Sequence, residues 1–472
     1  MKALSGVFHS RRYKSVVAWV RRDERHRRFR YFDLRRFANL ARVLLGVVVA
    51  SMCLMDESTA IEPWRAGVGR VDLTPPLSMQ AALGGYGARM SQPATGVHDR
   101  VWVKAIVLSD GQHKHAVVNA DILALPPRFK QEVAEKLGAD QWSADDLLFL
   151  PSHSHTSIDL MALNRRNAFG IPQLGVFHQD VLDWTVARFA ECITAAAREL
   201  VEIKSGSSTM TMEGWNRNRR GSGVTDPELT LTRIDTAAGQ PLAVLVNWPA
   251  HPTFMDDEDM SFSGDWPGHL QRTLEALIGN GVTVMYFNGA EGDQSPTPRV
   301  NDAPRWEQAE RYGRELAIEV WQQWKDLSQL TPTTIDWHVE DVALPPLAAH
   351  PELLEAGGKE YGLTAELAGP LLKLLCPERT HCTTLRFGDL VVVGVPGELT
   401  AELGREIKAA VRAQRGVQHV AVGGLADEWI SYILSREDYH RGGYEASMSF
   451  YGDTLGATIV AGAIRSATAN PK

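Results

Sequence analysis

Short hydrophobic runs bounded by Gly or Asp alternate along the chain with longer stretches that carry hydrophobic residues at helical spacing. The short runs are rich in Val, Ile and Leu and predict strands, whereas the longer stretches predict helices. Several runs are hydrophobic at every position, which is typical of sheets covered on both faces. The expected strands are residues 105–110, 116–121, 147–150, 229–235, 242–248, 282–287 and 390–395, and the expected helices lie within residues 176–200, 305–324 and 401–411.

Strands and helices interleave from Trp64 onward, with no linker, low-complexity tract or internal repeat between them. This order predicts an α/β fold in which mixed β-sheets are covered by helices. The chain has 472 residues, 44% of them hydrophobic, which suffices for one large domain or two modest ones. We expect a single large domain at residues 61–472.

Polar residues follow directly on four of the expected strands. In α/β sheets, ligands gather at the carboxyl ends of strands. We therefore expect these four groups to converge on one site. They are residues 152–157, His251, residues 289–295 and Glu398.

Residues 1–60 read as a targeting segment that precedes the domain. An Arg-rich stretch is followed by a hydrophobic run at residues 43–55, which is shorter than the roughly 20 residues of a membrane span. Such a run fits the core of a signal peptide, and Ser58-Thr-Ala60 provides small residues for cleavage. We expect an exported protein. An uncleaved anchor, or a cytoplasmic protein with a basic tail, is the alternative.

Charge and cysteine content narrow the classes of function. Residues 1–60 carry a net charge of +8, so residues 61–472 carry −16 of the total of −8. So acidic a body argues against nucleic-acid binding, which needs clustered Lys and Arg. Cys376 and Cys382 flank a short loop and could form a disulfide, whereas Cys192 lies in a helical pattern typical of the core. Because no C-x-x-C motif is present, a metal ion would be held by His and carboxylate side chains.

Three histidines are candidates for a metal site or for acid–base chemistry. His153 and His155 stand two apart in Pro151-Ser-His-Ser-His-Thr-Ser157, and side chains at that spacing share a face if the segment is extended. Imidazole is the commonest zinc ligand and titrates nearest to neutral pH. His251 follows a hydrophobic strand and precedes a proline. Surface or structurally bonded histidines are the alternative for all three.

Other polar residues have weaker individual signals. Asp265 stands where it would cap a helix beginning near Trp266. Glu398 occupies a strand-to-helix junction, where it could be a metal ligand or an acid favoured by the helix dipole. Ser295 lies in a Gly-rich loop that lacks the Lys and the spacing of a phosphate-binding loop, and Tyr432 and Tyr444 lie in an aromatic, charged stretch.

Several of these segments, in this order, resemble the catalytic domain of the neutral/alkaline ceramidase family. They are Gly67-Val-Gly-Arg-Val-Asp-Leu-Thr-Pro-Pro76, Leu83-Gly-Gly-Tyr-Gly87, Gly96-Val-His-Asp-Arg100, Asn119-Ala-Asp121, Ser152-His-Ser-His155, Ala250-His-Pro252, Gly292-Asp-Gln-Ser-Pro296, Pro396-Gly-Glu-Leu-Thr400, Tyr432-Ile-Leu-Ser435 and Gly443-Tyr-Glu-Ala446. The resemblance spans residues 64–465 and implies a catalytic domain of the neutral-ceramidase type.

The resemblance implies a zinc site and the residues around it. The Asn-Arg repeat at residues 216–219 leaves open whether Arg217 or Arg219 is the family's substrate-binding arginine. Asp293 and Ser295 would line the site. The implied zinc ligands are His153, His251, Glu398 and Tyr432, and the implied catalytic residues are His155, Arg219, Ser295 and Tyr444.

The implied function is a zinc-dependent amidohydrolase that cleaves an N-acyl amide, such as ceramide, into an amine and a fatty acid. Thr156-Ser-Ile-Asp159 and Gln294 depart from the family pattern and put ceramide itself in question. No exposed hydrophobic run is evident near the candidate site. A hydrolase of another amide, lactam or ester, or an exported binding protein, is the alternative. The expected partner is a small-molecule or lipid amide, with possible association with a membrane surface and no nucleic acid.

Overall fold

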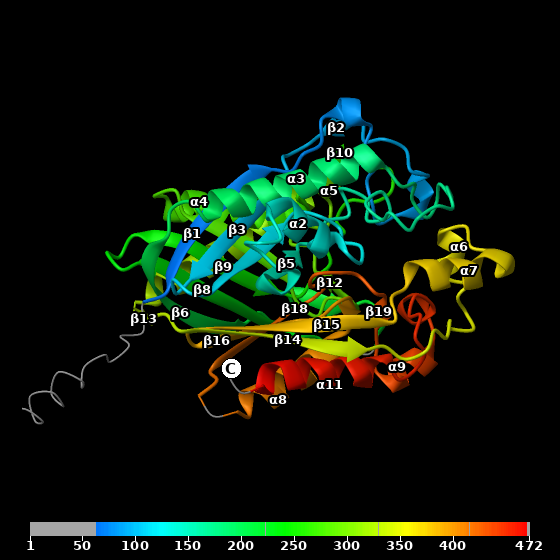
Figure 1. The fold of residues 1–472 in the computed structure, drawn as a ribbon. Helices are drawn as coiled ribbons and strands as arrows, with labels where there is room; N and C mark the ends of the chain where they lie inside the picture. Colours follow the sequence, from blue (N-terminus) through cyan, green and yellow to red (C-terminus); the bar gives the residue numbers. More distant parts are fainter. Residues whose placement is uncertain (1–62, 222, 329, 415, 470–472) are drawn as a thin grey trace, which may run out of the picture. The chain divides into compact units, whose positions relative to one another are not determined.

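The computed structural model describes residues 63–221, 223–328, 330–414 and 416–469 (Figure 1). The targeting segment expected in residues 1–60 lies outside them. Among the described residues, no helix combines the length and the hydrophobicity needed to cross a bilayer.

The larger sheet has nine strands and is mixed. Its order is β11-β9-β8-β6-β1-β3-β4-β5, with β13 beside β6. The end pairs β4–β5 and β9–β11 are parallel, and the neighbouring pairs between them are antiparallel. The strands are β1 (Arg65–Asp72), β3 (Trp102–Ser109), β4 (Lys114–Ala120), β5 (Leu147–Pro151), β6 (Val201–Thr211), β8 (Glu228–Thr236), β9 (Pro241–Trp248), β11 (Thr283–Asn288) and β13 (Thr331–Pro332).

The larger sheet curves until its two parallel end pairs lie side by side. The side chain of Asn119 on β4 donates hydrogen bonds to the carbonyls of Leu150 on β5 and Tyr286 on β11. Asn288, the last residue of β11, donates to the carbonyl of Ser152 just beyond β5 (3.2 Å). The carboxyl ends of β5, β9 and β11 therefore meet.

A second sheet of four strands lies beneath the first (Figure 1). Leu390 and Val392 of β16 pack between the two sheets, whereas Val391 and Val393 pack against the helices on the other face. A strand buried on both faces must be hydrophobic at every position, which explains the continuous run that predicted it. The order is β14 (Ile335–Ala343), β15 (Arg379–Phe387), β16 (Leu390–Gly394) and β18 (His419–Gly423).

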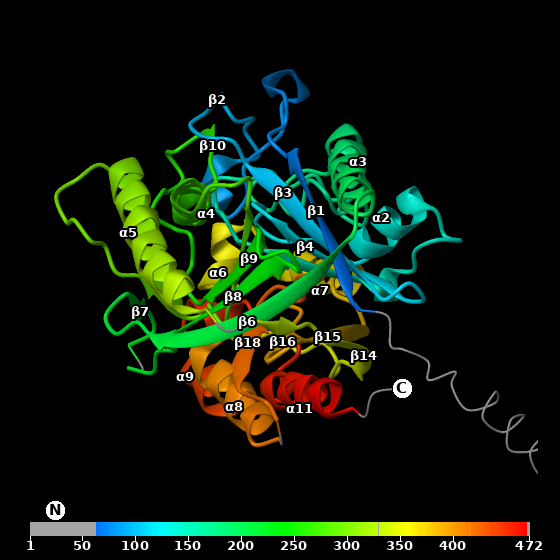
Figure 2. The same ribbon diagram turned by 90° about the vertical axis from the view of Figure 1, so that its left-hand side faces the viewer.

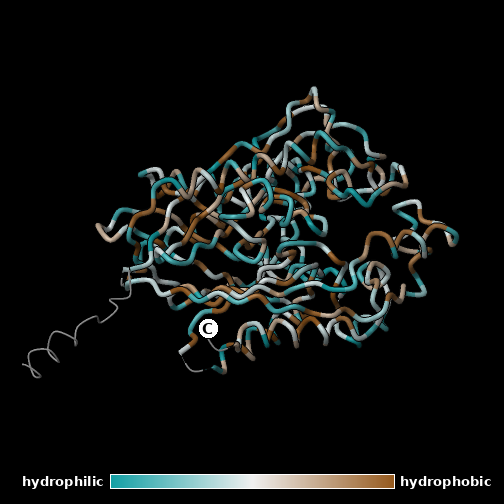
Figure 3. Tube along the Cα trace, in the orientation of Figure 1, coloured by the Kyte–Doolittle hydropathy of each residue, from teal (hydrophilic) through white to brown (hydrophobic). Residues whose placement is uncertain are grey.

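Helices cover the outer face of each sheet and give four layers (Figure 2). The α2–α3 pair packs on one half of the larger sheet and the α4–α5 pair on the other, while α8 and α11 cover the smaller sheet. Hydrophobic residues recur along the interior strands and helices (Figure 3). The helices are α2 (Phe129–Leu137), α3 (Gln179–Ala196), α4 (Asp265–Ile278), α5 (Arg305–Asp326), α8 (Ala401–Arg412) and α11 (Leu455–Thr468).

Short elements build the edge of the fold at which the strands end. Three two-stranded pairs, β2–β10, β7–β12 and β17–β19, join segments distant in sequence. The elements are β2 (Gly96–Val97), β7 (Asn216–Asn218), β10 (Ser261–Phe262), β12 (Gln294–Pro296), β17 (Glu398–Leu399), β19 (Tyr432–Ile433), α6 (Gly357–Glu360), α7 (Ala365–Leu375), α9 (Arg436–Arg441) and α10 (Tyr444–Ser447), with 3-10 turns at Leu77–Met79, Gly87–Arg89 and Ala144–Asp146.

The structure confirms the predicted α/β class, with mixed sheets covered by helices, and each expected strand and helix is present. The suggested Cys376–Cys382 disulfide is wrong, because both thiols are free and buried. Cys376 follows α7, whereas the Sγ of Cys382 on β15 lies near Gly462 of α11. Cys192 is buried in the core, as expected.

The interior holds one charged link between β3 and the layer of α4. Lys104 on β3 is 2% exposed and donates to the Glu275 carboxylate on α4 (2.7 Å) and to the carbonyl of Val284 on β11 (2.8 Å). A buried ammonium depends on such a partner, because its charge is otherwise unsolvated.

We predict that Glu275→Ala lowers the free energy of unfolding by about 3–5 kcal/mol, because it leaves the Lys104 charge buried without its carboxylate. Urea denaturation at pH 7 measures the change. Glu191→Ala is the matched control, since Glu191 is 52% exposed and pairs with Arg188 at the surface, where the expected loss is below about 1 kcal/mol. Equal losses in the two variants would contradict the prediction.

Candidate metal centre and active site

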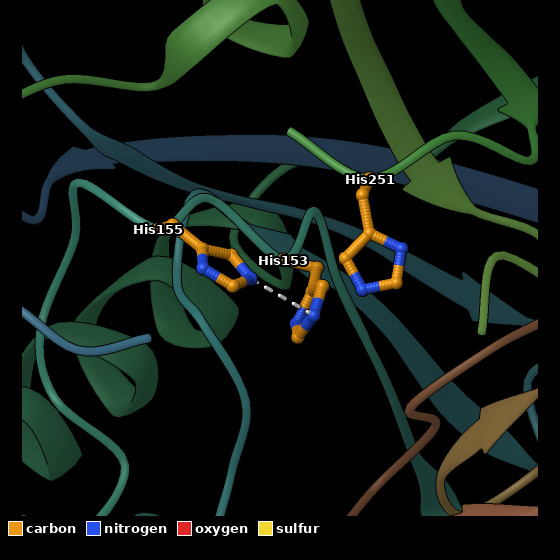
Figure 4. A group of neighbouring side chains, drawn as sticks. All are labelled: His153, His155 and His251. Atoms are coloured by element: carbon orange, nitrogen blue, oxygen red, sulfur yellow. Dashed lines mark hydrogen bonds between the residues drawn. The ribbon is translucent and has the colours of Figure 1, made fainter. Parts of the chain in front are cut away.

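Three histidines meet where the strands of the larger sheet end (Figure 4). His153 and His155 follow β5, and His251 follows β9. The Nε2 atoms of His153 and His155 are 3.3 Å apart, and the ring centroids of His153 and His251 are 4.8 Å apart. One nitrogen from each ring lies within 4.8 Å of the others, so the three could hold a metal ion.

His153 and His155 lie close together for a reason other than the expected one, which was an extended segment with both side chains on one face. His153 has φ of 70°, in the left-handed region, so the chain turns at this residue. The turn is held by hydrogen bonds from the His153 amide to the Ile122 carbonyl (3.0 Å) and from the His153 side chain to the Leu123 carbonyl (2.7 Å). Proximity of the two rings therefore comes from a strained turn and not from strand periodicity.

Backbone carbonyls fix the orientation and the tautomer of two of the imidazoles. Nδ1 of His153 donates to the Leu123 carbonyl, and Nδ1 of His251 donates to the Glu291 carbonyl (2.8 Å). A carbonyl oxygen only accepts, so in each neutral ring the proton is on Nδ1 and the Nε2 lone pair is free. Metal-binding histidines are commonly held in this way.

Both free Nε2 lone pairs face one carboxylate oxygen. Oε2 of Glu398 is 3.0 Å from Nε2 of His251 and 3.5 Å from Nε2 of His153. Burial, followed by the charge of Arg219, lowers the pKa of His251 to about 4, so this ring is neutral at pH 7. Burial acts to raise the pKa of Glu398, but the adjacent His153 and His251 hold it well below its usual range. Three electron-pair donors facing one another fit a cation at their centre.

The pairing of β17 with β19 brings Glu398 beside Tyr432. The two residues are direct partners in a parallel register. The other Glu398 oxygen, Oε1, accepts a hydrogen bond from the indole of Trp429 (2.9 Å). Tyr432 is buried, and its hydroxyl accepts a hydrogen bond from Arg219 (2.9 Å). Two His, one Glu and one Tyr therefore approach one centre from both sheets.

The predicted catalytic residues surround this cluster at different distances. Arg219 points to the site and pairs with Glu445 (2.7 Å), whereas Arg217 is exposed. Burial lowers the pKa of His155 well below its usual value, with His153 and His251 adding to the shift. The hydroxyl of Tyr444 lies 3.3 Å from that of Tyr361.

The Gly-rich loop after β11 supports the cluster from behind. Ser295 on β12 lines neither of the cavities described below. Asp293 accepts hydrogen bonds from Asn218 (2.6 Å) and from the amide of Ala401 at the start of α8 (2.9 Å), so it joins the loop to that helix. The expected capping role of Asp265 is wrong, because Gly264 is the N-cap of α4 and no side chain caps it; Asp265 is the first helical residue, and its carboxylate accepts from the adjacent Trp266 amide (2.5 Å).

Two residues of the site were not singled out from the sequence. Glu291 lies with His153 and Glu398 in a second potential ligand group, and neither of its buried carboxylate oxygens has a hydrogen-bond partner. Burial, and then the charge of Glu398, raises the pKa of Glu291 well above its usual value. Trp429 holds Glu398 in place. Only the position of Glu291 in the polar loop after β11 could have drawn attention to it.

Two cavities open from the histidine cluster and share Gly85, His155, Tyr432 and Tyr444. One is hydrophobic, with a volume of about 130 Å³, and the other is polar and open, with a volume of about 660 Å³. No single hydrophobic run marks this wall along the chain, because the wall is assembled from short, separate segments. The hydrophobic wall includes Leu123, Leu160, Met161, Leu363, Leu371, Leu372, Leu375, Trp429 and Phe450.

Gly85 stands at the junction of the two cavities for a steric reason. Its φ is 92°, and a Cβ atom there would lie 2.3 Å from Nδ1 of His155. Only glycine leaves room for the imidazole in this conformation. Gly85, the second glycine of the pair after Leu83, is thus required by the position of His155.

Comparison with known families identifies the chain. The model of the neutral/alkaline non-lysosomal ceramidase N-terminal region matches residues 64–297 and 372–459, which include all eight predicted site residues. The chain belongs to this ceramidase family.

Relatives and solved structures agree with this family. The neutral ceramidase of Pseudomonas aeruginosa is 20% identical over 492 aligned positions, which cover 87% of this chain and 72% of that protein. Neutral ceramidase A of Dictyostelium discoideum is 25% identical over 277 positions, covering 52% of this chain and 37% of that protein. The crystal structure of the Pseudomonas neutral ceramidase superposes with a TM-score of 0.75 at 19% identity, covering 86% of this chain and 74% of that one. A structure described as a ceramidase complexed with C2 gives 0.73 at 18% identity, covering 86% and 75%.

In this ceramidase-family chain, the buried carboxyl of Asp159 borders the hydrophobic cavity. Burial raises the pKa of Asp159 to about 7, although the amides of Met161 and Ala162 act to lower it. The folded-state pKa therefore lies above the unfolded value of about 3.9. The folded protein then binds the proton more tightly, so stability falls as the pH rises from about 4 to 7.

We predict that Asp159→Asn, which mimics the neutral carboxyl, raises the free energy of unfolding at pH 8 by up to about 4 kcal/mol and changes it little at pH 4. Thermal unfolding of both proteins across this range measures the difference. Asp257→Asn, in an exposed loop, serves as the control and should shift neither end. A wild-type advantage at pH 8 would contradict the prediction.

Proposed function

We propose that this chain is a zinc-dependent amidohydrolase that cleaves an N-acyl amide bond. The observation that carries the proposal is the meeting of the Nε2 atoms of His153 and His251 with the Glu398 carboxylate in a buried site. Zinc prefers such nitrogen and oxygen donors, and the Tyr432 hydroxyl would complete the set. Bound zinc supplies Lewis acidity and a lowered pKa of water, which amide hydrolysis near neutral pH requires.

The remaining residues take roles that follow from their protonation. His155 is neutral because its pKa is lowered, so it is free to accept a proton from the attacking water and pass it to the leaving amine. Burial raises the pKa of Tyr444, so its hydroxyl keeps the proton that it would donate to the carbonyl oxygen of the substrate. Arg219 orients Tyr432 through the hydrogen bond to its hydroxyl. Ser295 would act from behind His251, on β12 at the end of the Gly-rich loop that follows β11.

The names of the relatives support an N-acyl amide as substrate, since they are neutral ceramidases. The reaction adds water across the amide, R–CO–NH–R′ + H₂O → R–COO⁻ + R′–NH₃⁺, and so releases a fatty acid and an amine. Export, with the leader removed or kept as an anchor, is part of the proposal and depends on the pattern of residues 1–60 alone.

We predict about one zinc ion per wild-type chain and loss of that zinc in His251→Ala, with turnover of an N-acyl sphingosine reduced by at least about 100-fold. Elemental analysis and release of the fatty acid are the measurements. His113→Ala is the control, because the His113 side chain is 67% exposed and lies in a turn distant in sequence from the site residues. This variant should keep both the zinc and the turnover.

Two outcomes would contradict this proposal in different ways. Turnover that survives complete chelation would exclude zinc as the catalytic metal. A zinc-loaded protein that hydrolyses no amide or ester of a broad panel would favour the exported binding protein.

A further inference from the structure

The two cavities that meet at the histidine cluster have opposite chemistry. We call them the apolar arm and the polar arm. Both reach His155, Tyr432 and Tyr444, so a substrate whose amide lies at the cluster extends into both arms. Each arm therefore selects one of the two groups that the amide joins, the acyl group or the amine group.

The apolar arm suits a hydrocarbon chain of limited length. Most of its wall is hydrophobic, with Leu, Met and aromatic side chains, and α7 supplies Leu371, Leu372 and Leu375; away from the histidine cluster, Asp159 and Asn164 are the polar residues of the wall. A water molecule needs roughly 10–15 Å³ of such space. The volume of about 130 Å³ therefore accommodates a chain on the order of ten carbon atoms.

The polar arm carries charges of both signs. Arg219 and Arg220 both pair with Glu445, and Arg220 is almost fully buried. Arg441, which also pairs with Glu437 and Asp438, and Glu360 stand on the remaining walls. A second hydrocarbon chain would remove these charges from water without compensating them, which is unfavourable. A carboxylate on the substrate would instead face the guanidinium groups of this arm, which can bind it through charge-assisted hydrogen bonds.

Part of the wall of each arm lies outside the region matched by the family model. Residues 298–371 are unmatched, and they contribute Glu360 to the polar arm and Tyr361, Leu363 and Leu371 to the apolar arm. In Figure 1 this stretch includes α6 and the beginning of α7 at the edge of the molecule. The residues that could bind a metal lie within the region that the family model matches, whereas these parts of the two walls lie outside it.

We propose that the substrate is an N-acyl amino acid, with an acyl chain on the order of ten carbons in the apolar arm and the amino-acid carboxylate near Arg441 in the polar arm. The inference depends on the amidohydrolase function proposed above. Hydrolysis breaks the C–N bond, leaves the water oxygen on the fatty acid and transfers a proton to the nitrogen. The released amino acid is a zwitterion, which matches the mixed charge of the polar arm.

The first test compares three amides of one acyl chain on the wild-type protein. N-decanoylglycine should exceed N-propyldecanamide, which lacks the carboxylate, at least tenfold in kcat/KM, and should also exceed N-decanoylsphingosine. Equal or faster turnover of the propylamide or the sphingosine amide would overturn the inference and leave the amidohydrolase standing. Absence of turnover on all three, with zinc bound, would count against the amidohydrolase itself.

The second test changes the polar arm. Arg441→Gln should lower kcat/KM for N-decanoylglycine at least fivefold more than for N-propyldecanamide, mainly through KM. Arg436→Gln is the matched control, since the Arg436 side chain is 77% exposed, pairs with Asp453 and lines neither arm. Equal losses on the two amides would overturn the assignment of the carboxylate to this arm.

The third test shortens the apolar arm. Leu375→Trp should lower the preference for N-decanoylglycine over N-butanoylglycine at least tenfold, whereas Leu374→Trp, on the exposed side of α7 (39% exposed), should not change it. Faster hydrolysis of N-succinyl decylamine than of N-decanoylglycine by the wild type would reverse the orientation and overturn the proposal. Circular dichroism checks that the Leu375→Trp protein is folded. If it is not, the comparison of the two amides in Arg441→Gln decides whether the proposal stands.

Discussion

The site depends on one constraint: the Nε2 atoms of two imidazoles and a carboxylate are held facing one another in a buried site. Left to themselves, such groups repel or take up protons, so the fold must hold each from behind. The carbonyls of Leu123 and Glu291 hold the two rings, and the Trp429 indole holds the carboxylate. These hydrogen bonds are made before any ligand is bound, and they reduce the reorganisation that binding would otherwise require.

The two sheets must stay in register for this arrangement to persist, because His153 and His251 come from the larger sheet and Glu398 follows a strand of the smaller one. Polar ties at the strand ends link the sheets. The amide of Asn247 on β9 donates to the carbonyls of Asn288 on β11 (3.1 Å) and of Val422 on β18 (2.9 Å). Asp427, just beyond β18, accepts from the Phe149 amide on β5 (2.8 Å) and from Lys130 (2.9 Å). Buried ties of this kind fix position as well as stability.

The sequence predicted those features that local chemistry determines. Strands such as β16 were evident because burial on both faces demands an unbroken hydrophobic run, and the four polar groups were evident because they follow such runs. β6, with the sequence Val-Glu-Ile-Lys-Ser-Gly-Ser-Ser-Thr-Met-Thr, carries no such run and was not foreseen. Its place is set by pairing with β8 along its whole length, which only the tertiary structure determines.

Features assembled from distant segments were beyond local pattern. The turn at His153 depends on carbonyls of residues 122 and 123, and the apolar arm is built from segments that extend from Leu123 to Phe450. The sequence left Arg217 and Arg219 as alternatives, and only the pairing of β7 with β12 turns Arg219 toward Tyr432. The residue types thus predicted the chemistry of the site, whereas its shape could be established only from the folded structure.

The two buried glutamates of the site show how one environment assigns opposite charge states. Glu398 accepts a hydrogen bond from the Trp429 indole and has a lowered pKa, whereas Glu291 has no hydrogen-bond partner and a raised one. Two carboxylates so close do not both ionise without a cation between them, so the charge settles on the one with partners. A divalent cation bound to Glu398 would then need no second anionic ligand to be held. Since His153, His251 and Glu398 come together without the α6–α7 segment, that segment is free to change the shape of the arms without disturbing the residues that could hold a metal ion.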